Sequence, residues 1–229
     1  MTPSKSPNIP RCPSRDEIGA GVREVLVSGM GAKADVLVVD VAGGSVIVKD
    51  FAGRGLWARR IGQLQIRREL AAYRWLEGVP GIPALVGRID SFALAIERID
   101  GERLAFAALK PGDGPRIVEE LRAILDAIHA RGVIHNDLRG RENVLLRRGG
   151  GLAVVDFAGA VRLRPGGLAH RFLFRRLATA DEAAFLKWKG MIVPGSYTRQ
   201  DEAFLRRFER WRGLWPFNPK RRKAKARVA

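Results

Sequence analysis

Residues 133–146 read VIHNDLRGRENVLL, and residues 154–160 read VVDFAGA. Both stretches set polar and charged side chains between apolar runs that are typical of buried strands. Burial of such side chains costs free energy unless partners or ions satisfy them. This composition therefore indicates a functional site, whose candidate members are His135, Asn136, Asp137, Asn143 and Asp156.

These residue types point to a definite chemistry. A carboxylate can accept the proton of an attacking hydroxyl, and an Asn with a second carboxylate offers the oxygen ligands that Mg²⁺ prefers. The two stretches resemble the catalytic loop and the metal-binding aspartate of the protein-kinase-like superfamily, H-R-D-x-x-x-x-N and D-F-G. The resemblance implies that Asp137 is the catalytic base and that Asn143 and Asp156 hold Mg²⁺.

The loop departs from that pattern in its spacing, because five residues separate Asp137 from Asn143. Glu142 stands where counting alone puts the metal ligand, and it remains an alternative to Asn143, which directly precedes the strand-like run NVLL. Arg139 resembles the family's lysine near the transferring phosphate and is a further catalytic candidate. The alternative for Arg139 is an ordinary surface arginine.

Two motifs upstream extend the resemblance to the nucleotide. Residues 29–36, GMGAKADV, resemble the loop G-x-G-x-x-G-x-V with its last glycine replaced, which implies that Gly29 and Gly31 cover the phosphates of ATP. Residues 46–49, VIVK, resemble the V-A-I-K strand, which implies that Lys49 holds the α- and β-phosphates.

Two further positions fit the same family. Glu69 lies near the middle of the next predicted helix, 20 residues after Lys49, and the resemblance implies that the two side chains pair. Residues 97–101, ERIDG, resemble the hinge between the lobes, which implies that backbone groups of Glu97 and Ile99 meet the adenine.

Periodicity predicts the architecture around these motifs. Strand-like runs at 24–29, 35–41 and 45–51 predict an antiparallel meander, and the capping-box spacing of Ser14 and Glu17 predicts a short helix before it. A helix over 61–77 and strands at 84–89 and 92–98 complete a five-stranded sheet with one helix. Beyond Gly101 we expect a helix over 116–132, a strand pair at 143–146 and 152–157, and two or three helices from about residue 168.

The predicted fold is therefore α+β and bilobal, with a β-rich nucleotide lobe and a shortened, mainly α catalytic lobe. The predicted divisions are a flexible arm at 1–13, a nucleotide lobe at 14–100, a catalytic lobe at 101–215 and a basic tail at 216–229.

Composition narrows the class of partner and the compartment. Lys and Arg number 41 against 24 Asp and Glu, a net charge of +17 that favours anionic partners. The single cysteine, Cys12, excludes an internal disulfide and fits a reducing compartment. The first residues lack the apolar run of a secretory signal, and no stretch approaches the ~18 apolar residues of a membrane span. We therefore expect a cytoplasmic protein.

The length of the second lobe bears on the acceptor. No A-P-E motif occurs and only about 70 residues follow the D-F-G-like segment, too few for the peptide-binding subdomain of ordinary protein kinases. The compact lobe resembles the RIO-type serine/threonine kinases and the bacterial lipopolysaccharide (Kdo/heptose) kinases. Aminoglycoside and choline phosphotransferases, which usually carry a larger helical acceptor domain, rank third.

The C-terminal stretch suggests contact with a membrane. Trp211, Trp215 and Phe217 lie beside six basic residues between 220 and 227, a combination typical of peripheral binding to an anionic surface. The alternative is that the aromatic rings pack on the lobe and the tail is solvated. A nucleic-acid partner is not expected, because no aromatic-bearing RNA-binding motif accompanies the charge.

Three functions follow from these observations. The first is an ATP- and magnesium-dependent kinase that phosphorylates a sugar hydroxyl of a glycolipid such as a lipopolysaccharide precursor, at the inner face of the membrane. The second is an atypical, RIO-like serine/threonine protein kinase. The third is a non-catalytic pseudokinase that serves as a binding module, against which the presence of Lys49, Glu69, Asp137 and Asp156 argues.

Overall fold

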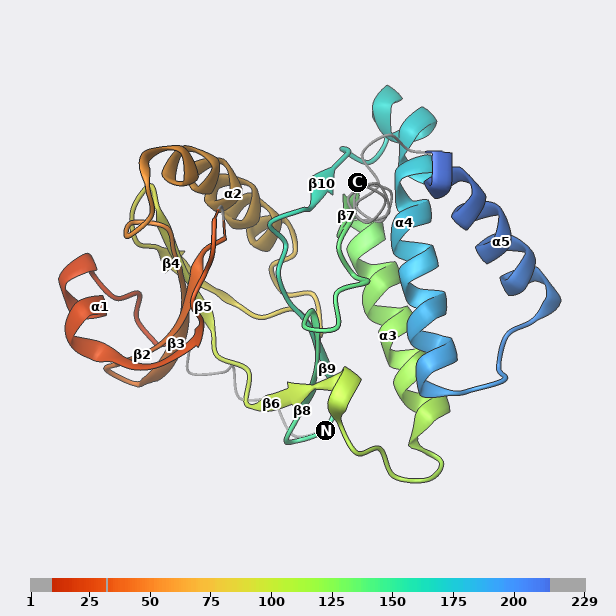
Figure 1. Cartoon of the computed structure of the whole chain (residues 1–229), viewed down its shortest axis with the longest axis horizontal. Helices are drawn as coiled ribbons and strands as arrows, with labels where there is room; N and C mark the ends of the chain where they lie inside the picture. The colour runs from red at the N-terminus through yellow and green to blue at the C-terminus, as the bar shows by residue number, and fades with distance from the viewer. Residues whose placement is uncertain (1–9, 32, 215–229) are drawn as a thin grey trace, which may run out of the picture.

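The computed structural model describes residues 10–31 and 33–214, which form the two lobes of Figure 1. The first lobe holds α1 (Arg15–Gly21), β1 (Val22–Val27), β2 (Asp35–Val41), β3 (Gly44–Asp50), α2 (Leu56–Trp75), β4 (Leu85–Arg88) and β5 (Ala93–Glu97). The second holds β6 (Gly101–Arg103), η1 (Leu104–Phe106), α3 (Asp113–Ala130), β7 (Val133–Ile134), β8 (Val144–Arg147), β9 (Leu152–Val154), β10 (Val161–Arg162), α4 (Leu168–Ile192) and α5 (Arg199–Leu214). The predicted α+β, bilobal fold is confirmed.

The first lobe is built on one antiparallel sheet with the strand order β1-β2-β3-β5-β4, which confirms the predicted five strands. β2 and β3 pair without a break from Asp35↔Asp50 to Val41↔Gly44. The predicted capping box of Ser14 and Glu17 opens α1. α2 begins at Leu56, before the predicted start at residue 61. The prediction missed this first turn because its apolar side chains face solvent and show no core-facing pattern; Leu56 is 80% exposed.

The two faces of the sheet bury different clusters. Along β5, Ala93 and Ala95 join the small cluster that packs on Ile18 of α1, whereas Leu94 and Ile96 belong to the main core on the α2 side. Successive strand residues point to opposite faces, so this alternation follows from the pleat. Cys12 packs on the same small cluster, so the described part of the predicted N-terminal arm lies against the sheet, while residues 1–9 lie outside the described residues.

The fit between α2 and the sheet gives a stability prediction at Gly62. A Cβ at this buried position would lie 2.3 Å from Cγ of Phe51. Alanine normally stabilises a helix interior by about 1 kcal/mol over glycine, but overpacking costs about 1–3 kcal/mol and outweighs it here. We expect Gly62→Ala to lower the free energy of unfolding, measured by urea denaturation. Gly19→Ala in α1, where a Cβ meets nothing within 4 Å, is the control and should not destabilise; equal stability of both variants would contradict the packing.

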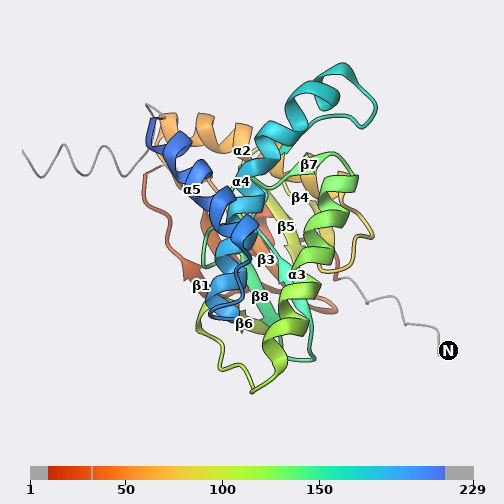
Figure 2. The ribbon, with the colours of Figure 1, turned by 90° about the vertical axis from the view of Figure 1, so that its right-hand side faces the viewer.

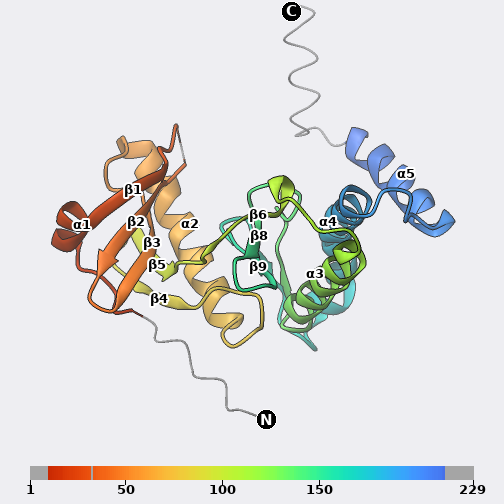
Figure 3. The same cartoon turned by 90° about the horizontal axis from the view of Figure 1, so that it is seen from below.

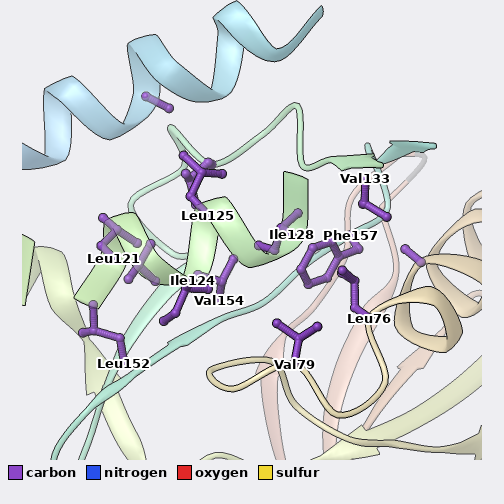
Figure 4. Packing of buried hydrophobic residues seen from close by; sticks show 14 of the residues in the cluster. Leu76, Val79, Leu121, Ile124, Leu125, Ile128, Val133, Leu152, Val154 and Phe157 are labelled. Atoms are coloured by element: carbon purple, nitrogen blue, oxygen red, sulfur yellow. The ribbon is translucent and has the colours of Figure 1, made fainter. Parts of the chain in front are cut away.

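The second lobe is built around α3, whose apolar positions recur at helical spacing. Ile117, Leu121, Ile124 and Ile128 are all buried, as expected for one face of an amphipathic helix. Figure 4 shows Phe157 beside Ile128, with Leu76 and Val79 from the first lobe on the other side of its ring. One hydrophobic core therefore runs from lobe to lobe and holds the D-F-G-like segment at their junction.

α4 and α5 complete the second lobe. They lie side by side with α3 in Figure 2, and Figure 3 shows α5 on the side of α4 that is remote from the sheet. β8 and β9 form the predicted strand pair, to which β6 adds a third strand. Within residues 10–31 and 33–214, no helix has the length and apolar character needed to cross a membrane. The predicted basic tail, 216–229, lies outside the described residues.

Candidate active site

Lys49 is held between two carboxylates from different parts of the fold. It shares a face of β3 with Ile47, so its side chain points to the α2 side of the sheet. Its Nζ lies 2.6 Å from Oε1 of Glu69 on α2 and 2.8 Å from Oδ1 of Asp156, which follows β9. The side chains of Lys49 and Glu69 are 13% and 2% exposed, so the predicted pair exists and is buried.

The charges in this group shift one another's pKa values. Burial favours the neutral form of Lys49, but the two carboxylates outweigh burial and raise its pKa. Burial raises the pKa of Glu69 despite the nearby ammonium. For Asp156 the attraction of Lys49 overcomes the effect of burial and lowers the pKa. Asp156 therefore remains ionised at neutral pH and can attract a cation.

Asp137 and Asn143 come together on the loop between β7 and β8. The Nδ2 of Asn143 donates to the backbone oxygen of Asp137 at 2.8 Å and to its Oδ2 at 3.4 Å. Asn143 is buried, whereas Asp137 is exposed. Partial desolvation and the negative charge of Asp156 raise the pKa of Asp137, which makes it a better proton acceptor. Glu142, the alternative ligand, is exposed and lies 3.9 Å from Arg103.

His135 braces this loop from below. It is fully buried, with Nε2 3.0 Å from the carbonyl oxygen of Val155 and Nδ1 accepting from the N–H of Asp137 at 3.3 Å. Its ring lies 4.7 Å from that of Phe157, which in turn meets Tyr73 of α2 at 5.3 Å. These aromatic contacts connect α2, the D-F-G-like segment and the catalytic loop.

Asp181 of α4 anchors the same loop, a role that motif matching missed. Its carboxylate accepts from the backbone N–H groups of His135 and Asn136, both at 2.7 Å, and lies 3.0 Å from Nε2 of His129. These contacts hold Asn136 at φ 63°, in the left-handed region that costs free energy for most residues. The sequence signal was a carboxylate on the face of α4 that also carries the buried Phe185 and Trp188.

We expect Asp181→Asn to loosen the loop and to destabilise the protein. The amide cannot accept both backbone N–H groups through charge-assisted bonds, so the free energy of unfolding should fall by about 2–3 kcal/mol. Glu182→Gln is the control, because that side chain is 38% exposed and pairs with Arg122, and it should change stability by less than about 1 kcal/mol. Urea denaturation compares the two; equal losses would contradict the anchoring role.

A cavity of about 370 Å³ opens between the lobes above these side chains. Its polar lining includes Glu97 and Arg98, Lys49 of β3, and Glu142, Asn143 and Asp156 of the second lobe, and Ile99 also lines it. The N–H of Glu97 already bonds to the oxygen of Ala84 at 2.9 Å, so Glu97 can offer a ligand its carbonyl oxygen. Apolar side chains from both lobes form the walls; they are Leu26, Val27, Val36, Val38, Ile47, Ile96, Leu145 and Val155.

Two groups of predicted residues lie elsewhere. Gly29 and Gly31 are in the β1–β2 loop and do not line the cavity, although Gly29 is sterically required, since a Cβ there would lie 2.3 Å from the oxygen of Lys33. Arg139 lines a different cavity and lies 3.5 Å from Glu209 of α5. The structure therefore brings Lys49, Glu69, Asp137, Asn143 and Asp156 together but not Arg139.

The oxygen donors of the site fit a divalent cation. Asp156 contacts Lys49 and the N–H of Ala158 through Oδ1, and Asn143 donates through Nδ2, so neither contact uses Oδ2 of Asp156 or Oδ1 of Asn143. Both residues line the same cavity. A carboxylate and an amide oxygen with open solvent beside them suit Mg²⁺, which usually keeps several waters.

No protein-family model matches the chain. A stretch of 113 residues is 29% identical to the serine/threonine-protein kinase PEPKR2 of Arabidopsis thaliana and covers 46% of this chain and 24% of that protein. A second stretch, of 124 residues, is 26% identical to CBL-interacting serine/threonine-protein kinase 21 of the same plant and covers 52% and 30%. The chain thus spans less than a third of the length of these curated relatives.

Solved structures are similar over more of the chain. The Rio2 kinase of Chaetomium thermophilum superposes with a TM-score of 0.57 over 81% of this chain and 63% of that one, at 16% identity. Its ADP/Mg²⁺-phosphoaspartate complex superposes with a TM-score of 0.52 over 82% and 71%, at 15% identity. The two lobes, the Lys49–Glu69 pair within the first of them and these superpositions agree, and the chain has the fold of the protein-kinase-like superfamily.

Proposed function

We propose that the protein is an ATP- and magnesium-dependent kinase that phosphorylates a serine or threonine hydroxyl of a protein. The observation that carries the proposal is Lys49, bonded to Glu69 and Asp156 at the inner end of a cavity with room for a nucleotide. A pseudokinase is disfavoured, because each of the charged groups that phosphoryl transfer requires is present and in contact with its neighbour.

The cavity combines apolar walls with charged side chains, which suits a nucleotide. The adenine would lie between the apolar walls, with the carbonyl oxygen of Glu97 and the backbone of Ile99 at its edge. Lys49 would bind the α- and β-phosphates, since Glu69 keeps its ammonium charged and fixed in direction. The preorganised ammonium needs no rearrangement during the reaction.

Asp156 and Asn143 would hold magnesium, which when bound neutralises charge on the phosphates. In the transfer, the acceptor oxygen forms a bond to the γ-phosphorus and the bond from that phosphorus to the β,γ-bridging oxygen breaks, which releases ADP. Asp137 orients the hydroxyl and takes its proton, and its raised pKa suits that task.

A protein acceptor is preferred to the glycolipid that the basic tail suggested. The curated proteins that this chain resembles are serine/threonine kinases, and the solved structures are of a RIO-type kinase. The case for a membrane glycolipid rests on the resemblance of the compact lobe to lipopolysaccharide kinases, which none of these comparisons repeats, and on residues 211–229, whose side chains lie outside the described part of the structure. The glycolipid therefore becomes the alternative outcome of the test.

An acceptor screen with labelled ATP tests this proposal. The full-length protein is incubated with soluble protein extract and, separately, with purified membrane glycolipid. Label in phosphoserine or phosphothreonine supports the proposal. Label confined to lipid would assign the sugar hydroxyl instead, and no label in either fraction would count against a kinase.

A further inference from the structure

A second cavity, of about 320 Å³, lies beside the catalytic loop and is lined by Arg139, Arg141, Ala184, Lys187, Trp188 and Met191. Among the described residues that line it, three of the six side chains are cations and none is a carboxylate. Like charges repel and are normally dispersed over a surface. Their gathering in one concave place suits an anion, whose charge would relieve the repulsion.

The position of this cavity, close to Asp137, favours an anion that is part of the acceptor molecule. Arg139 follows Asp137 by two residues, so their Cα atoms are no more than about 7.6 Å apart. The indole Nε1 of Trp188 donates to the carbonyl oxygen of Leu138 at 2.9 Å, which fixes the loop against α4. A group bound in the cavity therefore lies within a few residues' reach of a hydroxyl at Asp137.

The ion pairs of the described residues engage only one of the three cations that line the cavity. Arg139 lies 3.5 Å from Glu209 of α5, which shows that a carboxylate can approach this place. Among residues 10–31 and 33–214, Arg141 and Lys187 form no ion pair, and both are exposed. Arg141 and Lys187 therefore remain available to an incoming anion.

We infer that this cavity, formed by Arg139, Arg141 and Lys187, binds an acidic group of the acceptor and makes the protein selective for serine or threonine close to aspartate, glutamate or a phosphorylated residue. The inference rests on the proposed function, because it describes the acceptor of the same reaction. Carboxylate and phosphate share the negative oxygens that these cations recognise, and separate peptides distinguish them.

The test uses the full-length protein and the variant Arg141→Glu/Lys187→Glu. Matched peptides place one serine among glutamates, among glutamines or beside phosphoserine, and kcat/KM is measured for each. We expect the acidic peptides to exceed the glutamine peptide by about tenfold in the wild type, and the variant to lose that preference. The control is Arg60→Glu/Arg67→Glu, which makes the same change of charge on the exposed side of α2. This variant should keep the preference for acidic peptides.

Binding of fluorescent, serine-to-alanine versions of the same peptides is measured in parallel by anisotropy. The inference is supported if the acidic peptides bind more weakly to the Arg141→Glu/Lys187→Glu variant but not to the control variant. This holds even if no peptide is phosphorylated. Absence of phosphorylation would count against the proposed function but not against the binding site. Measurable but equal kcat/KM for acidic and glutamine peptides, or acidic-peptide binding that survives the charge reversal, would overturn the inference. The peptide with the larger preference identifies the source as carboxylate or phosphate.

Discussion

Asp156→Asn is expected to reduce phosphotransfer by about a thousandfold while the protein remains folded. The side chain at this position needs a negative charge, because Asp156 contacts Lys49 at 2.8 Å and offers its other oxygen to a cation. Asparagine preserves the shape and tolerates φ 67°, the left-handed conformation that Asp156 adopts. The substitution therefore removes charge with little effect on the backbone.

Transfer of label from ATP to the best acceptor measures this loss, and urea denaturation checks that the variant is folded. Asp126→Asn is the control, since that carboxylate lies on the outer side of α3 with a side chain 64% exposed, and it should keep full activity. Asp137→Asn should also lose activity, by about 10²–10⁴-fold, because it removes the proton acceptor. Activity that persists in the Asp156→Asn variant would refute the role of Asp156 in phosphotransfer, whereas no transfer by the wild type itself would favour a binding module.

Lys49→Met is expected to lower the free energy of unfolding by about 3 kcal/mol as well as abolish activity. Removal of the ammonium leaves Glu69 buried, at 2% side-chain exposure, without its partner. The double variant Lys49→Met/Glu69→Gln leaves only Asp156 without its partner, and that side chain is 41% exposed, so the variant should recover more than half of the loss. Lys189→Met is the control, because its pair with Asp201 is more exposed, and it should cost about 1 kcal/mol or less.

The pH dependence of the Lys49→Met variant gives an independent check. Burial raises the pKa of Glu69 in the folded protein, and without Lys49 that effect is unopposed. A carboxyl group with a raised folded-state pKa stabilises the fold below its unfolded pKa, and this contribution disappears as pH rises through the folded pKa. Urea denaturation should therefore show a smaller loss of unfolding free energy in the Lys49→Met variant, relative to the wild type, at acid pH than at neutral pH. A deficit independent of pH, or one unchanged in the double variant, would mean that Glu69 is not the source.

The parts of the site that lie close together in the sequence could be predicted from it. Alternation along 46–49 places Lys49 on one face of a strand, and local spacing places Glu69 on the helix that follows. The catalytic loop was identified by its polar residues between apolar runs. The sequence left Asn143 and Glu142 as alternative ligands; both line the cavity, and only the folded loop shows that Asn143 contacts Asp137 whereas Glu142 lies near Arg103.

Distant contacts escaped sequence reasoning for a common reason. Asp181 lies more than 40 residues after the two backbone groups that it anchors, and nothing in local periodicity links a helix to a particular loop. Arg139 follows Asp137 closely, yet the direction of the turn sends it to α4 and α5 rather than to the cavity between the lobes. Gly29 likewise serves the close packing of its own hairpin.

Residue types, their order and their local periods thus suffice for the strands, the helices and the identity of the charged groups, because these depend on interactions between near neighbours. The meeting of Lys49 with Asp156, the anchoring of the loop by Asp181 and the gathering of Arg141 with Lys187 depend on how the lobes and helices pack. Packing is decided by burial summed over the whole core, which no single segment encodes.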